Sequence, residues 1–539
     1  MEYSLVLIFV LFFVAITILV TWLTTKYVKT AADFYVTGNK TPWILTGIAM
    51  VGSYLSAASF LGVSGGIAIF GVDKIWIAIG FFGGYMAVLL LIAGPLRNVG
   101  SYTVADAFYA RFPAKEIKLW VMICTLVISI FYLVPQILGA GLLFELLLKW
   151  DFLFVIISIG VLICIYIIFG GMKATIYNQV IQASFLFGIM VFLAVLGLII
   201  FVDGSFTKLI TLVSEIVPPS IAGADPSVAS AVSLAPDAKA AIDVARQILP
   251  DAPSAMTIGV HQTGLIAQIS TVIALVFGTA GLPHILIMFY TVPSAKAAKK
   301  SVMLCVVGLG IFYISSIILG FLLMPAIYPQ LVAWIAEGNV GFAKNMSVLT
   351  GANAIGGQVL MALAAAAAVA AILSTAAGLM IACASTVSND LYRVYINKNA
   401  TEKQELNIAK ITTVVVASIS VGLAYVLKHE NVAWLVTLGF GIAASAIFPA
   451  MVSNLWWRKL TRQGAIAGIA SGLIVSLIFI IALLSGVNTI IGLPTSGGPG
   501  VFGVVVSFIV LIVVSKFTKD TGTDVDKFFA TAHKPDEDM

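Results

Sequence analysis

The dominant pattern along the chain is a series of long apolar runs separated by short polar segments. An α-helix needs about 20 apolar residues to cross a bilayer, and the runs are of that order or longer. A β-barrel is excluded, because membrane strands are shorter and alternate apolar and polar residues with a period of two. The pattern predicts an all-α polytopic membrane protein with about 13 transmembrane helices, at 3–24, 42–70, 75–95, 119–148, 152–170, 174–202, 263–292, 301–328, 356–389, 406–427, 431–455, 464–485 and 500–516.

The first run, 3–24, could be mistaken for a signal peptide. It is longer than the apolar core of such a peptide, and Glu2 stands where a positive charge is expected. We therefore expect this run to remain in the protein as a membrane span.

Lysine and arginine are distributed unequally over the connections between the runs. Thirteen spans put the two ends of the chain on opposite sides of the membrane. If the N-terminus is outside, the cytoplasmic segments carry 22 of the 29 Lys and Arg residues, and the outer segments carry 7. Because cytoplasmic loops are enriched in Lys and Arg, the predicted orientation is N-out and C-in.

The composition agrees with this class and limits the chemistry. The chain is 61% hydrophobic and only 10% charged, and its mean hydropathy is +1.10. Its net charge of +5 reflects membrane topology, and we expect no nucleic-acid partner. The cysteines lie in apolar runs without metal-ligand spacing or pairing, so we interpret them as free buried thiols. They are Cys124, Cys164, Cys305 and Cys383.

Two adjacent hydroxyl residues, Ser374 and Thr375, lie in an apolar run that ends in charge at Asp390 and Arg393. A hydroxyl at membrane depth is satisfied either by a carbonyl one turn earlier or by something bound beside it. Two neighbouring oxygens beside an interrupted helix could hold a small hard cation such as Na⁺. On this stretch alone, back-bonding and cation binding explain the pair equally well.

Two other runs are interrupted by small residues or proline. The run 42–70 contains Gly52, Gly62, Gly65 and Gly66. The run 263–292 contains Gly278, Gly281 and Pro283. With the first span set aside, these are helices one and six of the remainder, and interrupted helices at matching positions indicate an inverted-repeat transporter. The alternative is ordinary small-residue packing and a proline kink, which are common in membrane helices.

Almost no ionisable side chain lies in the middle of a predicted span. A proton relay through side chains requires such groups, so it is disfavoured. Coupling to a metal cation held by hydroxyls and carbonyls requires none. An anionic substrate would be held by helix N-termini, hydroxyls and amides. We expect no cofactor, with Na⁺ acting as the coupling ion.

Seven motifs of the chain resemble those of the sodium/solute symporter family and, within it, those of the cation/acetate (monocarboxylate) symporter branch. The resemblance covers essentially all the spans, and the motifs are highly specific together although each alone would be weak. They are SYLSAASFLGVSG (53–65), RNVGSYTVADAFYARF (97–112), YLVPQILGAG (132–141), FGGMKATIYNQVIQ (169–182), FGTAGLPHILIMFYTV (277–292), NMSVLTGANAIGG (345–357) and ILSTAAGLMIACASTVSNDLY (372–392).

The resemblance implies a LeuT-like inverted repeat of five plus five helices, with one extra span before it and two after it. The chain would divide into an N-terminal helix and loop, a first repeat, an extracellular or periplasmic loop, a second repeat, two C-terminal helices and a cytoplasmic tail, at 1–41, 42–202, 203–262, 263–455, 456–516 and 517–539. Within the outer loop, 236–249 has the pattern of a short amphipathic helix. The loop would either cap the outer mouth or remain a passive surface segment.

The same resemblance implies binding sites for sodium and substrate. Sodium would be held by the backbone oxygens of Gly52, Leu55 and Ala371 and by the hydroxyls of Ser374 and Thr375. This implication favours cation binding over back-bonding for the hydroxyl pair. Substrate would lie beside the sodium, near Tyr54, Ser56, Thr279 and Ala280, with Tyr132 and Gln136 as weaker candidates.

Three places depart from the pattern of acetate-type members. Ser53 stands where Asp is frequent, Asn178 and Gln179 stand where an acidic residue is frequent, and Met288 replaces an Arg that usually follows the PHIL motif. The first two departures argue against a second, carboxylate-dependent sodium site, and all three weaken the transfer of the acetate assignment. His284 is interpreted as a packing or hydrogen-bonding residue beside the second interruption.

These observations predict a secondary active transporter of the bacterial inner (plasma) membrane. It would couple one inward Na⁺ to uptake of acetate, propionate or pyruvate by alternating access. The alternatives are the same fold carrying proline, another amino acid or a sugar, and a symporter-like sensor that acts through a separate partner. An enzyme is disfavoured because no paired carboxylates, metal-ligand cluster or nucleophile–base set is visible. Expected partners are a small organic anion, Na⁺ and the lipid bilayer, and a small accessory membrane protein is left open.

Overall fold

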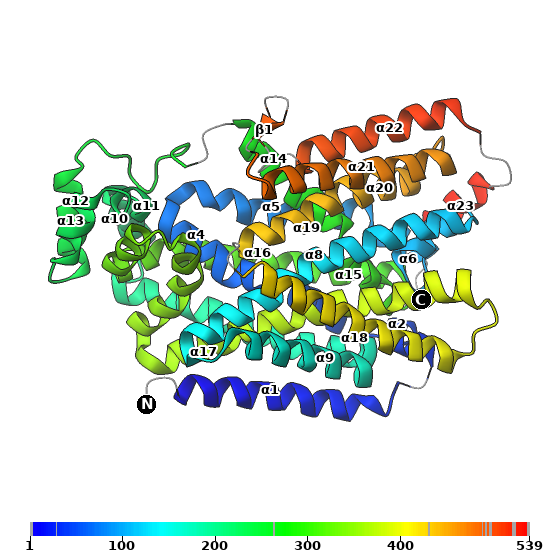
Figure 1. The fold of residues 1–539 in the computed structure, drawn as a ribbon, viewed down its shortest axis with the longest axis horizontal. Coiled ribbons are helices and arrows are strands. Elements are labelled where there is room, and N and C mark those ends of the chain that lie inside the picture. The colour runs from blue at the N-terminus through cyan, green and yellow to red at the C-terminus, as the bar shows by residue number, and fades with distance from the viewer. Residues whose placement is uncertain are drawn as a thin grey trace.

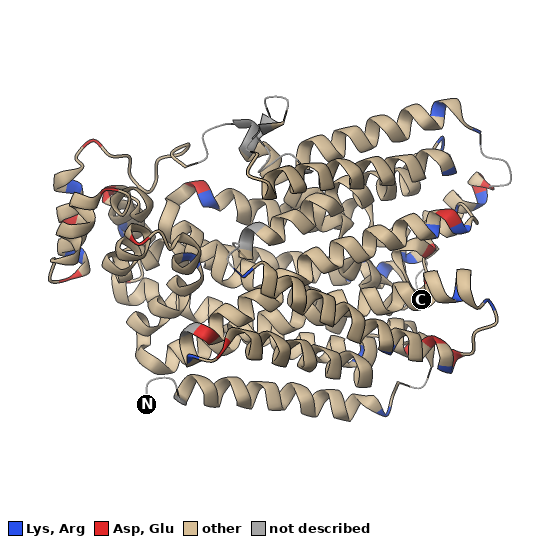
Figure 2. Cartoon of the chain, in the orientation of Figure 1, with Lys and Arg blue, Asp and Glu red and all other residues tan. Residues whose placement is uncertain are grey.

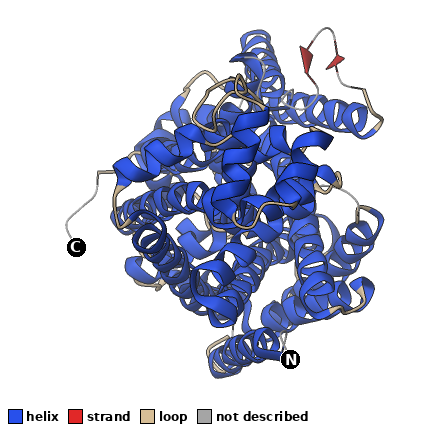
Figure 3. Ribbon diagram, turned by 90° about the vertical axis from the view of Figure 1, so that its left-hand side faces the viewer, coloured by secondary structure: helices blue, strands red, loops and turns tan. Residues whose placement is uncertain are grey.

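The computed structural model describes residues 4–28, 30–261, 265–428, 432–487, 489–490, 493–494, 499–519 and 524–535. These parts of the chain are almost entirely helical (Figures 1 and 3). The predicted tail, 517–539, and the ends of the predicted outer loop and N-terminal unit therefore lie partly outside the described residues.

The elements follow the chain in three groups. Before the long outer connection lie α1 (Ser4–Thr25), α2 (Ala31–Val36), η1 (Thr37–Asn39), α3 (Trp43–Tyr54), η2 (Ala58–Gly62), α4 (Val63–Phe70), η3 (Gly71–Lys74), α5 (Ile75–Leu91), α6 (Ala93–Val99), α7 (Val104–Tyr109), α8 (Lys115–Leu148) and α9 (Phe152–Val202). The connection holds α10 (Phe206–Glu215), α11 (Pro219–Ala222), α12 (Pro226–Ser233) and α13 (Ala238–Ile248). After it come α14 (Leu265–Gly281), α15 (Pro283–Leu286), η4 (Ile287–Thr291), α16 (Ala295–Ala336), α17 (Val340–Thr386), η5 (Val387–Ile396), α18 (Glu402–Val426), α19 (Val432–Ile442), η6 (Ala443–Ile447), α20 (Phe448–Trp456), α21 (Arg462–Leu484), a two-stranded pair β1 (Thr489–Ile490) and β2 (Leu493–Pro494), η7 (Pro499–Gly503), α22 (Val504–Phe517) and α23 (Val525–Ala532).

Within the described residues, ten helical segments are long and apolar enough to cross a membrane, and the bent pair α14–α15 makes an eleventh. Some segments are longer than a single crossing. α9 has 51 residues, or about 75 Å at 1.5 Å per residue. It is divided at Gly171, where φ is +52° and a Cβ would lie 2.8 Å from the Phe34 ring. This division falls between the predicted runs 152–170 and 174–202, while the total of thirteen stays a prediction.

The spanning helices lie side by side along the long axis of the molecule (Figure 1). Charged residues lie mostly toward the two ends of that axis and leave the middle largely uncharged (Figure 2). We call the end that carries α10–α13 the outer end, and the end that carries α6, α7 and α23 the inner end. α1 begins at the outer end and α22 ends at the inner end. The N-out, C-in orientation in a membrane stays a prediction.

The outer connection is packed against the spanning helices. The Tyr328 hydroxyl of α16 donates to the Val217 carbonyl at 2.8 Å. The buried Asp73 carboxylate accepts the backbone N–H groups of Gly259 at 2.7 Å and His261 at 2.8 Å. The helix expected at 236–249 is present as α13. The ring of His261 bonds the Ser220 hydroxyl at 2.9 Å, and burial lowers its pKa although Asp73 opposes the shift.

The C-terminal tail contains a docked helix, α23, for which the polar sequence gave no expectation. Two apolar side chains, Phe528 and Phe529, pack against the guanidinium of Arg111, whose carbon lies 5.6 Å and 5.2 Å from the ring centroids. The Arg111 guanidinium also donates to backbone carbonyls between α20 and α21, those of Asn454, Trp457, Arg458 and Leu460. The tail helix α23 is therefore part of the packed inner end.

Candidate functional site

The first interruption lies in the span formed by α3 and α4. α3 ends at Tyr54 because Leu55 leaves the helical region, with φ −72° and ψ 90°. The chain resumes as the π-helix η2 and then as α4. Gly52 allows α3 to approach α9, since a Cβ there would lie 2.6 Å from the Gln179 carbonyl oxygen. The break leaves the last carbonyls of α3 without the partners that a continuous helix would supply.

The second interruption separates α14 from α15. α14 ends at Gly281, Leu282 is extended, and Pro283 begins α15. The two helices are bent by 44°, and Pro283 has no N–H to continue the helical ladder. Gly281 meets η6 closely, because a Cβ there would lie 2.4 Å from the Ala443 carbonyl oxygen. Both interruptions predicted from the sequence are therefore present.

The two neighbouring hydroxyls on α17 behave differently. The Ser374 hydroxyl donates to the Ala371 carbonyl at 3.0 Å, which is back-bonding. The Thr375 hydroxyl is buried and has no hydrogen-bond partner in the described part of the chain. The Ser374 carbonyl accepts the Gln179 side-chain amide at 2.9 Å. The unpaired, buried Thr375 hydroxyl oxygen is a ligand of the kind that hard cations prefer.

Three elements meet beside this pair of hydroxyls. Gly378 lies one turn further along α17, and Ser53 of α3 and Gln179 of α9 both approach it. A Cβ on Gly378 would lie 2.7 Å from the Ser53 hydroxyl oxygen and 3.2 Å from the Gln179 amide nitrogen. The Ser53 hydroxyl also has no partner in the described part of the chain. Asn178, the neighbour of Gln179, instead bonds the Thr21 hydroxyl of α1 at 2.8 Å. Of these two amides, then, Gln179 alone faces the junction of α3, α9 and α17.

The candidate substrate residues fall into two adjoining groups. In the first, the Tyr54 hydroxyl lies 2.7 Å from the Thr279 hydroxyl and 3.0 Å from the Phe81 carbonyl oxygen. This contact ties the first interruption to the second. Ala280, the next residue on α14, is fully buried.

In the second group, Tyr132 of α8 lies within hydrogen-bonding range of the Ser56 side chain. Its ring packs edge-on against His284, with centroids 5.6 Å apart. Gln136, one turn further along α8, is fully buried. Neither its amide oxygen nor its amide nitrogen has a partner among the described residues.

Phe440 of α19 joins the two groups, and sequence reasoning missed it. Its ring centroid lies 6.2 Å from that of Tyr54, 5.3 Å from that of Tyr132 and 5.3 Å from that of Phe81. Nothing in the sequence distinguishes Phe440 from other aromatic residues of apolar spans. The structure places it as an aromatic wall between the two interruptions.

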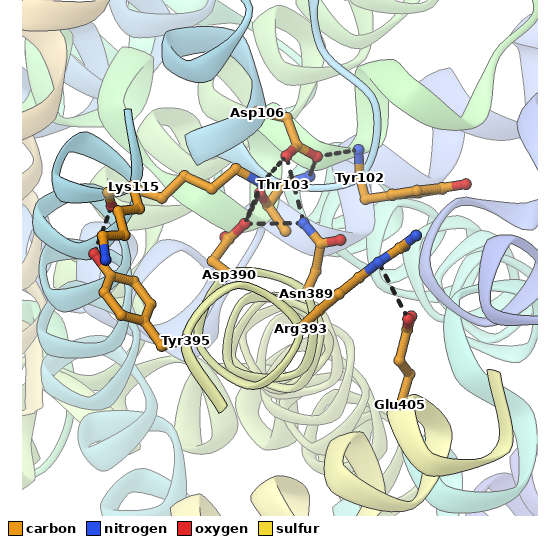
Figure 4. Close-up of polar contacts among 10 residues, drawn as sticks. Tyr102, Thr103, Asp106, Lys115, Asn389, Asp390, Arg393, Tyr395 and Glu405 are labelled. Atoms are coloured by element: carbon orange, nitrogen blue, oxygen red, sulfur yellow. Dashed lines mark hydrogen bonds and ion pairs between the residues drawn. The ribbon is translucent and has the colours of Figure 1, made fainter. Parts of the chain in front are cut away.

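All the residues assigned to sodium or substrate are buried in this conformation. At the inner end lies a polar group that we call the inner cluster, which joins α7, α8 and η5 (Figure 4). The Lys118 ammonium lies 2.6 Å from Asp106 Oδ1 and 3.1 Å from Asp390 Oδ1. Thr103 and Asn389 donate to Asp390 Oδ1 at 3.1 Å and 2.9 Å. The sequence showed Asp390 only as charge at the end of a span.

Comparison with known proteins agrees with this geometry. Residues 34–472 match the family model described as Sodium:solute symporter family. The chain belongs to the sodium:solute symporter family. It is 37% identical to an uncharacterized symporter, YwcA, of Bacillus subtilis, over 87% of this chain and 84% of the relative. It is 36% identical to a monocarboxylic acid transporter of Corynebacterium glutamicum, over 87% of this chain and 82% of the relative.

Solved structures show the same fold. A Na⁺-coupled sialic acid symporter in a substrate-bound outward-open state matches with a TM-score of 0.72 at 16% identity, over 96% of this chain and 99% of that one. Mhp1, a nucleobase-cation-symport-1 family transporter in a closed conformation, matches with a TM-score of 0.54 at 13% identity, over 93% and 99%. This chain is thus a multi-pass membrane protein and a Na⁺-coupled solute symporter with a LeuT-like all-helical fold, and the two relatives named above come from bacteria.

Proposed function

We propose that this symporter carries a small monocarboxylate, of the size of acetate, propionate or pyruvate, into the cell together with one Na⁺. The carboxylate class is supported by the Corynebacterium glutamicum relative, which is named a monocarboxylic acid transporter and matches most of this chain. The candidate site adds a second line of support, because its residues are buried and lie beside the aromatic rings of Phe81, Tyr132 and Phe440.

The observation that carries this proposal is a set of buried polar groups without protein partners where the two interruptions meet. Among the described residues these groups belong to Ser53, Gln136, His284 and Thr375. A polar group left unsatisfied in a membrane interior costs free energy. A cation beside Thr375 and a hydrogen-bonding anion beside Gln136 would satisfy these groups. Held in this way, Na⁺ and solute would stabilise the same junction.

The coupling follows from which elements each ligand would touch. Na⁺ held by Ser374, Thr375 and the carbonyls of Ala371, Gly52 and Leu55 would fix α17 against the end of α3. The end of α3 also carries Tyr54 and Ser56, which line the substrate position. Solute would therefore bind better to the Na⁺-loaded protein, and Na⁺ affinity must rise by the same factor when solute binds.

Competition identifies the solute. Uptake of labelled acetate into proteoliposomes under a Na⁺ gradient is measured against unlabelled propionate, pyruvate, proline and glucose. The proposal expects inhibition by propionate and pyruvate but not by proline or glucose. Two results would replace the monocarboxylate with another solute. The first is inhibition of acetate uptake by proline alone. The second is Na⁺-dependent uptake of proline in a protein that takes up no acetate. Equal solute affinity with and without Na⁺ would contradict the coupling.

A further inference from the structure

His284 is a buried histidine whose ring nitrogens lack partners. It is 1% exposed, and neither Nδ1 nor Nε2 forms a hydrogen bond with the described residues. A neutral imidazole carries one N–H donor and one acceptor nitrogen. Leaving both unpaired in an apolar interior is unfavourable, and such groups are normally satisfied in folded proteins. A packing role alone does not account for the imidazole.

The surroundings of His284 put it inside the candidate site. It follows Pro283, directly after the second interruption. Its ring packs edge-on against Tyr132, and the Ser53 backbone lies close enough to interact with the imidazole, without the geometry of a formed hydrogen bond. A Cβ on Gly378 would lie 3.5 Å from its Cδ2 atom. The imidazole therefore lies where α3, α8, α15 and α17 approach one another.

His284 differs from the other buried basic residues of the described chain in where it lies. The described part of the chain has two other buried basic residues, Arg111 and Lys118. Both lie at the inner end, where carbonyls or carboxylates already pair them. Met288, also buried, offers no charge one turn beyond His284. Of the described basic residues, His284 is thus the buried one at the level of the interruptions.

We propose that His284 is a substrate-binding residue whose ring N–H donates a hydrogen bond to the carboxylate of the solute. The proposal rests on the proposed function and names the group that recognises the anion. A carboxylate oxygen accepts from a neutral N–H donor without needing a full buried cation. Gln136, one turn beyond Tyr132 on α8, has an amide that is likewise unpaired and would offer a second N–H.

The test measures binding directly. The thermal unfolding midpoint of the purified full-length protein is followed with rising acetate or propionate at a fixed Na⁺ concentration, and acetamide is the neutral isostere. We expect carboxylates, but not acetamide, to stabilise the wild type. His284→Leu should raise the half-saturating carboxylate concentration at least about tenfold, the size of one hydrogen bond to a charged group. Stabilisation by Na⁺ alone should be unchanged.

Two further variants keep the test decisive. Met288→Leu, a buried change in the next turn, should behave as the wild type. His284→Asn keeps an N–H on a shorter side chain and should lose less affinity than His284→Leu. If His284→Leu fails to fold, shown by loss of its Na⁺ response, an unchanged half-saturating concentration in His284→Asn would overturn the proposal.

The outcomes separate this inference from the proposed function. Equal carboxylate response in the wild type and His284→Leu would overturn the role of His284 and leave the monocarboxylate proposal standing. A wild type that responds to Na⁺ but to no carboxylate would overturn both. Stabilisation by acetamide as strong as by acetate would show that the site does not recognise the charge.

Discussion

The central site and the inner cluster are both buried and polar, yet their hydrogen bonding differs. In the inner cluster the ammonium of Lys118 bridges Asp106 and Asp390, and Thr103 and Asn389 complete the network. In the central site, hydroxyls, an amide and an imidazole are buried without protein partners in the described chain. In the first arrangement the protein itself pairs the Lys118 ammonium with two carboxylates, although Asp390 Oδ2 has no hydrogen-bond partner among the described residues. The second is completed only when something binds.

This difference separates structural polar groups from functional ones. Removing one partner of a satisfied buried network leaves an uncompensated charge and should cost stability. Removing an unpaired group should cost little stability but should remove ligand binding. The same reasoning explains why the mid-membrane region carries so few charges. Each charge there would need a permanent partner, and a transporter site needs groups whose partners come and go.

The largest expected effect is on the inner cluster. Lys118→Met leaves the buried Asp390 beside the half-buried Asp106 without the cation that pairs them, and we expect a loss of about 3–5 kcal/mol of stability. Lys118→Arg should lose much less, because the charge remains. The thermal unfolding midpoint of the purified variants measures both. A Lys118→Met protein as stable as the wild type would show that the cluster is not a paired structural network.

Thr375→Val should have the opposite effect, because it should weaken Na⁺ binding without lowering stability. The substitution removes an unpaired buried hydroxyl at nearly constant volume, so stability without Na⁺ should be unchanged or higher by about 1 kcal/mol. The Na⁺ concentration that gives half of the maximal stabilisation should rise at least about tenfold. Ser385→Ala is the matched control on the same helix, since the Ser385 hydroxyl bonds back to Ile381 at 2.8 Å. A normal Na⁺ response in Thr375→Val would move the sodium site elsewhere.

Tyr54→Phe tests a contact that is shared between structure and function. Its hydroxyl bonds both Thr279 and the Phe81 carbonyl, so we expect a stability loss of about 1 kcal/mol. Because the contact joins the two interruptions, the half-saturating solute concentration should also rise by several fold. Solute uptake and thermal unfolding measured on the same preparation separate the two contributions. No change in either would remove Tyr54 from the site.

The smallest effect concerns the outer end and depends on pH. Burial lowers the pKa of His261 in the folded protein relative to the unfolded chain. Its contribution to stability is therefore complete above the unfolded pKa of about 6.5 and is lost as the pH falls through the lowered folded value. His261→Gln should flatten this part of the pH dependence of the unfolding midpoint. If His261→Gln loses as much stability at low pH as the wild type does, the effect belongs to another group.

The sequence predicted an all-helical membrane protein and both interruptions because each depends on local properties. Apolar length indicates which segments can cross a bilayer, and Gly281 with Pro283 favours a break because Pro283 has no N–H for the helical ladder. The hydroxyl pair was also visible, but only the structure shows that Ser374 back-bonds whereas Thr375 does not. That distinction depends on what α3 and α9 bring to α17, which one chain segment cannot reveal.

Features that depend on contacts between distant segments were not predictable. Phe440 looks like any aromatic residue of an apolar span, and its role comes from contacts with Tyr54 and Tyr132. The tail helix α23 is held in place by Phe528 and Phe529, which pack against Arg111, more than 400 positions earlier in the chain. His284 was interpreted as a packing or hydrogen-bonding residue, because a sequence does not show whether a ring nitrogen has a partner.

The central claim is that Na⁺ bound at the α17 hydroxyls drives solute uptake. Its most direct test is uptake of radiolabelled acetate into proteoliposomes under imposed Na⁺, K⁺ or H⁺ gradients, for wild type and Ser374→Ala/Thr375→Ala. The account predicts uptake driven by the Na⁺ gradient in the wild type and its loss in the double variant. Na⁺-driven uptake that survives in the double variant, or wild-type uptake driven by H⁺ and indifferent to Na⁺, would contradict it.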